Sequence, residues 1–210
     1  NEQAMNRLTR DTLLVISDVH IKGLTEFPEI VDKAEHKVVI DHHRKSADFI
    51  DDATLYYIET YASSASEMVT EILQYISDKI GLRPAEAEAL MAGIVIDTKY
   101  FTFKTGVRTF EAASYLKKCG ADTATVKQLM ADDMSTYIAR SDTVKNATMI
   151  GGNIAISVCG EKGAGTSLVV AQAADELLNI KGIDASFVIA QVGDDCIISG
   201  RSRGEISVQL

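Results

Sequence analysis

The sequence has few cysteines, only two prolines and no long apolar run. Its cysteines, Cys119, Cys159 and Cys196, are scattered and form no CxxC pair, which argues against a disulfide framework and against a zinc knuckle. No stretch approaches the ~20 apolar residues that span a bilayer, and the N-terminal segment lacks the apolar core of a signal peptide. We therefore expect a cytoplasmic piece that makes no membrane contact of its own.

Positive charge is also scarce. Lysine and arginine number 21 against 30 acidic residues, which gives a formal net charge of −9. Such a surface disfavours long nucleic acid as a partner. It does not exclude a small phosphate ligand, because a bound divalent cation or a local arginine cluster can invert the potential inside one cleft.

The hydrophobic pattern of residues 1–134 predicts an α/β domain, with a parallel sheet and helices on both faces. Two short runs, TLLVIS at 12–17 and KVVI at 37–40, are continuously apolar, as strands are when helices cover both faces of a parallel sheet. A third strand is expected at 54–59. Capping residues and apolar stripes predict helices at 64–80, 84–97, 107–119 and 122–132.

A polar connector helix is expected at 135–148, followed by a small α+β domain at 149–210. In that domain strands are predicted at 153–158, 185–192 and 196–200, with a helix at 167–179. The glycine-rich stretch at 163–167 lacks the full P-loop pattern, so Thr166 or Ser167 is interpreted as a helix cap.

Polar residues follow the first two predicted strands where each one ends. Asp18 follows the first, and the triplet Asp41-His42-His43 ends the second. Taken singly, such residues are often helix caps or surface residues, but the carboxyl ends of parallel strands meet at one edge, where ligands bind. Carboxylate and imidazole suit manganese, iron or zinc, and Asp97, which interrupts an apolar helix, is a third candidate ligand.

Four stretches in order resemble the DHH/DHHA1 phosphoesterases over nearly the whole chain. They are DVH at 18–20, VVIDHHR at 38–44, GIVIDTKYFTFKTG at 93–106 and GRSRGEISVQ at 200–209. Within that superfamily, residues 48–73 and 108–123 look most like the GdpP-type cyclic di-AMP phosphodiesterases. The resemblance implies hydrolysis of cyclic di-AMP to linear pApA by two Mn²⁺ ions, as part of second-messenger turnover.

The resemblance also implies roles for individual residues. Asp18 would bridge the two ions, His42 and Asp97 would ligate one of them, and His43 would face the scissile phosphate, so that these four form the catalytic site. Asp41 is expected to orient an imidazole without ligating a metal. No role is assigned to His20.

In the small domain, Arg201 and Ser202 match the family position that grips the substrate, and an arginine fork suits a phosphate. Arg203 is a neighbour of uncertain role, and a homodimer is a further expectation.

The chain departs from its family at both ends. Relatives carry an upstream HxxxDxD motif and a downstream GGGH segment that this chain lacks, and Ser207 replaces an asparagine. We therefore expect a fragment, itself inactive, of a parent attached to the inner face of the cell membrane. Two alternatives stay open: a phosphodiesterase for short linear oligonucleotides, and a non-catalytic nucleotide-sensing module.

Overall fold

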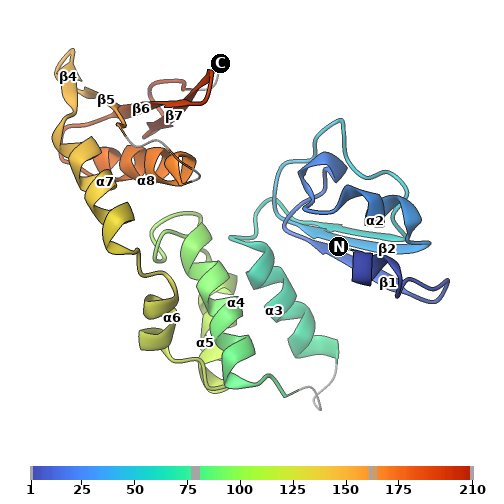
Figure 1. Cartoon of the computed structure of the whole chain (residues 1–210). Helices are drawn as coiled ribbons and strands as arrows, with labels where there is room; N and C mark the ends of the chain where they lie inside the picture. The colour runs from blue at the N-terminus through green and yellow to red at the C-terminus, as the bar shows by residue number, and fades with distance from the viewer. Residues whose placement is uncertain (1, 77–80, 161–162, 164, 209–210) are drawn as a thin grey trace. The chain divides into compact units, whose positions relative to one another are not determined.

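The computed structural model describes residues 2–76, 81–160, 163 and 165–208, and the chain divides into two compact units. The first comprises Asn1–Met130 and the second Ala131–Leu210 (Figure 1). Over the described residues, no helix combines the length and hydropathy that crossing a bilayer requires. The finer division at 134 and 148 stays a prediction.

A parallel three-stranded sheet opens the first unit, after a short helix α1 (Glu2–Met5). Its order is β1 (Leu13–Ser17), β2 (His36–Asp41), β3 (Leu55–Ile58). The 3₁₀ turn η1 (Lys22–Leu24) and helix α2 (Pro28–Lys33) connect β1 to β2. The predicted parallel α/β architecture is confirmed.

Both faces of β2 are buried, which explains its unbroken apolar sequence. Val39 packs in one cluster with Val31 of α2, while the adjacent Ile40 packs in another with Met68 of α3. Neighbouring residues in a strand point to opposite faces, so a central strand covered on both sides requires apolar residues at consecutive positions.

Four helices complete the first unit: α3 (Ala65–Ile76), α4 (Pro84–Asp97), α5 (Val107–Lys118) and α6 (Thr123–Leu129). Their shared core includes Met91, Ile94 and Leu116. At the start of α3 the Ser64 hydroxyl accepts the Glu67 N–H, as the capping pattern predicts, but the Glu67 carboxylate accepts a hydrogen bond from Ser63. The last part of the predicted helix, 77–80, lies outside the described residues.

The second unit is an α+β structure, as expected. Its sheet has the order β4 (Thr148–Ile150), β5 (Ile154–Val158), β6 (Ala185–Val192), β7 (Asp195–Ser202), with β5 and β6 parallel and the outer pairs antiparallel. Helix α8 (Thr166–Leu178) supplies half of the buried residues of its core cluster. Helix α7 (Met134–Lys145), predicted as a connector, packs on α8 through Arg140, which contacts Gln172 and Glu176.

Helices α3 and α4 approach so closely at Gly93 that no larger residue fits. A Cβ at position 93 would lie 2.1 Å from the Ser66 Oγ atom and 2.9 Å from its Cβ. We expect Gly93→Ala to destabilise the protein by about 1–3 kcal/mol through overpacking, measured by chemical unfolding. Gly23→Ala, which meets nothing within 4 Å, is the matched control and should be nearly neutral.

The double variant Gly93→Ala/Ser66→Gly relieves the contact, so it should be no less stable than Ser66→Gly alone. Equal stability of Gly93→Ala and Gly23→Ala would contradict the assigned packing.

Candidate metal centre

Two strand ends bring the candidate ligands together. β1 and β2 are parallel neighbours in which Ser17 pairs with Ile40, so the residues that follow meet at one edge of the sheet. The Asp18 N–H donates to the Ile40 carbonyl at 2.9 Å. Asp18 itself has a φ of 65°, a left-handed conformation that non-glycine residues adopt at a cost and often at functional sites.

His42 is the centre of the cluster. Its Nε2 atom lies 3.3 Å from Asp18 Oδ1 and 3.6 Å from Asp97 Oδ2. The ring is buried, and among the described residues its Nδ1 atom has no hydrogen-bond partner. An imidazole nitrogen that faces two carboxylates is suited to share a cation with them.

One group of side chains among the described residues could hold a metal ion, and the expected ligand set of Asp18, His42 and Asp97 stays a prediction. Ligand atoms of Asp18, His42 and His43 lie within 4.8 Å of one another. Asp97, expected as a ligand, lies beside His42 at the end of α4. Two carboxylates and two imidazoles form a mixed donor set that fits a first-row divalent ion.

Burial raises the pKa of the Asp97 carboxyl above its ordinary value. The nearby His42 opposes this effect, while the Asp18 carboxylate adds to it. Both the burial and the like charge disfavour the ionised form of Asp97. A cation at this position would favour the ionised form of Asp97.

Asp41 is fully buried and contacts His20 and His43. Its Oδ2 bonds with His20 Nδ1, and its Oδ1 lies 2.7 Å from His43 Nδ1. Burial alone would raise the pKa of Asp41, but these hydrogen bonds outweigh it and hold the pKa below its ordinary value. Asp41 therefore contacts two imidazoles, those of His20 and His43, and its expected role in orienting a histidine at the metal stays a prediction.

His20 is the contact that the sequence reasoning missed. It is buried, bonds with Asp41 through one ring nitrogen and accepts the Ser46 N–H at the other, 3.0 Å away. The signal available was its place three residues after the end of β1, beside a neighbouring strand that ends in a carboxylate.

Two pockets adjoin Asp18. One, of about 340 Å³, also includes Ser66, Gly93 and Asp97. The other, of about 200 Å³, also includes His20, His43 and Arg44. The metal-binding group is thus accessible to a small ligand.

In the second unit, Arg201 lies on β7 with its guanidinium held in place. Its Nε donates to Asp175 Oδ1 at 2.8 Å and its Nη1 to Ser199 Oγ at 3.0 Å. The Ser202 hydroxyl accepts the Gly204 N–H. Substrate binding by Arg201 and Ser202 stays a prediction.

Arg203 has a structural contact in this unit. It donates to the carbonyls of Ile183 and Leu178, so it bonds to the backbone at the end of α8 and just before β6.

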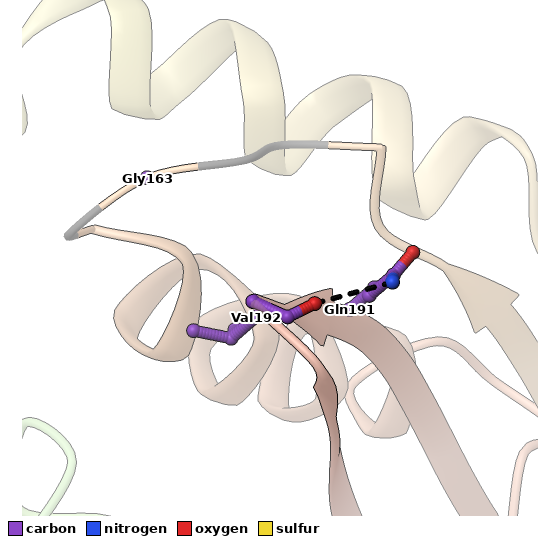
Figure 2. A pocket seen from close by; sticks show the side chains of 4 residues that line it. Gly163, Gln191 and Val192 are labelled. Carbon is purple, nitrogen blue, oxygen red and sulfur yellow. Dashed lines mark hydrogen bonds between the residues drawn. The ribbon is translucent and has the colours of Figure 1, made fainter.

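The glycine-rich stretch borders a shallow pocket of about 300 Å³ at the β6–β7 hairpin, which includes Gly163, Gln191 and Val192 (Figure 2). The Gln191 side-chain amide donates to the Gly193 carbonyl there. Thr166, the first residue of α8, accepts the Gly163 N–H at 3.0 Å. The Thr166 hydroxyl thus ties this loop to the start of the helix.

Residues 1–94 belong to the DHH family, since they match the model of the DHH family, N-terminal domain. The chain is 45% identical over 210 residues to the cyclic-di-AMP phosphodiesterase GdpP of Geobacillus thermodenitrificans, covering 100% of this chain and 32% of the relative. It is 43% identical over 208 residues to the cyclic-di-AMP phosphodiesterase PdeA of Listeria monocytogenes, covering 99% and 32%. The chain spans about a third of the length of these relatives.

A solved structure shares the fold at low identity. An exopolyphosphatase-related protein from Bacteroides fragilis aligns with a TM-score of 0.81 and 18% identity, covering 97% of this chain and 62% of that chain. At this identity the likeness concerns the fold alone.

We expect the chain to bind a first-row divalent cation, tested with Co²⁺ as the probe. At 100 times its Kd, a ligand stabilises the folded state by about 2.7 kcal/mol, which corresponds to a rise in Tm of roughly 5–10 °C at this size. His42→Ala should lose most of this shift, whereas His36→Ala, an exposed imidazole at the start of β2, should retain it. Equal shifts in both variants would remove His42 from the site.

Proposed function

We propose that this chain forms part of a Mn²⁺-dependent phosphodiesterase that hydrolyses cyclic di-AMP to linear pApA. The observation that carries the proposal is its 45% identity, over all 210 residues, to a relative named for cyclic di-AMP hydrolysis. The cluster of Asp18, His42 and His43 supports it, because phosphodiester hydrolysis commonly uses cations held by carboxylates and imidazoles.

Asp18, His42 and Asp97 would hold the Mn²⁺ ions, as the family resemblance implies. When bound, such ions withdraw charge from the phosphate and make water a better nucleophile. The chain's own contribution is to hold the donors in position. Buried His42 sits between two carboxylates, and the short distances limit how far each side chain can move.

His43 is proposed to face the scissile phosphate. Its Nδ1 atom is bonded to Asp41, and its side chain is 57% exposed, so its Nε2 atom is the ring nitrogen that can reach a substrate. Arg201 and Ser202 are proposed to contact the dinucleotide. The Asp175 carboxylate holds Arg201 by its Nε, which orients the planar fork for a phosphate.

The cellular location and the oligomeric state of the intact protein are further parts of the proposal. The intact protein would be attached to the inner face of the cell membrane and would form a homodimer, with this part in the cytoplasm. A net charge of −9 favours a small substrate over long nucleic acid.

We expect the intact protein that contains this chain to convert cyclic di-AMP to pApA when Mn²⁺ is added, followed by chromatography of the products. Asp97→Asn should lower kcat at least ~100-fold, since loss of a cation contact costs several kcal/mol and each 1.4 kcal/mol is a factor of ten. The exposed Asp11→Asn is the matched control and should retain full turnover.

Other outcomes would replace the proposal with an alternative. Faster cleavage of pApA than of cyclic di-AMP would indicate a phosphodiesterase for short linear oligonucleotides. Tight binding of cyclic di-AMP without turnover would indicate a sensing module.

A further inference from the structure

His20 is buried, and its hydrogen bonds determine which ring nitrogen carries the proton. The Ser46 backbone N–H donates to His20 Nε2 at 3.0 Å. A backbone amide can only donate, so Nε2 must carry the lone pair. The proton of the neutral ring therefore lies on Nδ1, which donates to Asp41 Oδ2.

The same reasoning continues from Asp41 to His43. Asp41 Oδ1 accepts the backbone N–H of His43 at 3.1 Å and faces His43 Nδ1 at 2.7 Å. An ionised carboxylate only accepts, so His43 also donates from Nδ1. In a neutral ring this leaves the lone pair on His43 Nε2, the nitrogen that can bind a cation or accept a proton from water.

We propose that His20 is a positioning residue that holds Asp41 and, through Asp41, keeps the His43 imidazole with its proton on Nδ1 and its lone pair on Nε2. Among the described residues, His20 supplies the hydrogen bond to Asp41 Oδ2. Without it that oxygen would stay buried and unpaired, which costs free energy, and the carboxylate would turn toward other donors. The importance of this arrangement for catalysis rests on the proposed function, whereas the series of hydrogen bonds from His20 through Asp41 to His43 does not.

Two substitutions separate the two hydrogen bonds of His20. In His20→Asn the side-chain amide can place its N–H near the former Nδ1 position and keep the donor to Asp41. In His20→Gln the longer side chain reaches the former Nε2 position and keeps a partner for Ser46, but lacks the donor to Asp41. Both variants retain a polar side chain, and His36→Gln, at an exposed site, is the control for histidine loss.

The first measurement is the long-range ¹H–¹⁵N spectrum of the imidazoles in the chain without added metal, near pH ~8, where an ordinary imidazole is neutral. The chain has four histidines; variants at His20 and His36, together with His42→Ala, each remove one signal, and the remaining pattern belongs to His43. We expect the Nδ1–H tautomer for His43 in the wild type and in His20→Asn, and a mixture of tautomers in His20→Gln. A His43 pattern that is unchanged in His20→Gln, or the Nε2–H tautomer in the wild type, would overturn the proposal.

The second measurement is turnover of cyclic di-AMP by the intact protein. Loss of a partner that orients a histidine at a metal site typically costs 10–100-fold, so His20→Gln should lower kcat by about that factor with little change in KM, and His20→Asn should restore most of it. Equal losses in the two variants would overturn the positioning role. A wild type without turnover would count against the proposed function alone, because the spectra decide the tautomer independently.

Discussion

The metal centre depends on a buried carboxylate. Asp41 ends the middle strand of the sheet and is fully buried, so water cannot solvate its charge. An ionised group in such a place costs several kcal/mol unless nearby donors compensate. His20 and His43 supply these donors, and this requirement fixes the segments that follow β1 and β2. The need to satisfy Asp41 thus places Asp18, His42 and His43 around one point.

Strained backbone lies next to two of the candidate ligands. Asp18 has a φ of 65°, and Lys99, Tyr100 and Phe101, just after Asp97, have φ values of 46°, 58° and 61°. Each such residue costs of order 1–3 kcal/mol and persists only where other contacts determine it. Asp18 bonds through its N–H to Ile40, and the buried Thr98 hydroxyl accepts the Phe101 N–H. These contacts hold the Asp18 and Asp97 carboxylates in positions that an unstrained backbone would not give them.

The proposed anionic substrate would meet two carboxylates at the candidate metal site. Asp18 and Asp97 both lie within 4 Å of His42, and burial together with the Asp18 charge raises the pKa of Asp97. This concentration of carboxylates would repel a phosphate. A divalent cation reverses the local potential. An anionic substrate would therefore need the metal to be bound before it could occupy this site.

The sequence by itself determined the class of fold and the edge of the sheet at which the candidate ligands Asp18 and His42 meet. Continuous apolar runs predicted β1 and β2, and parallel strand ends predicted that Asp18 and His42 would meet, because both patterns depend on local periodicity. The short, exposed strand β4 was not predicted, since it carries no buried face. Only the tertiary structure decided that Asp41 contacts His20 and His43 and that His42 faces Asp97. Beyond a strand end, side-chain direction is set by contacts with residues distant in the chain, and local periodicity gives no information about them.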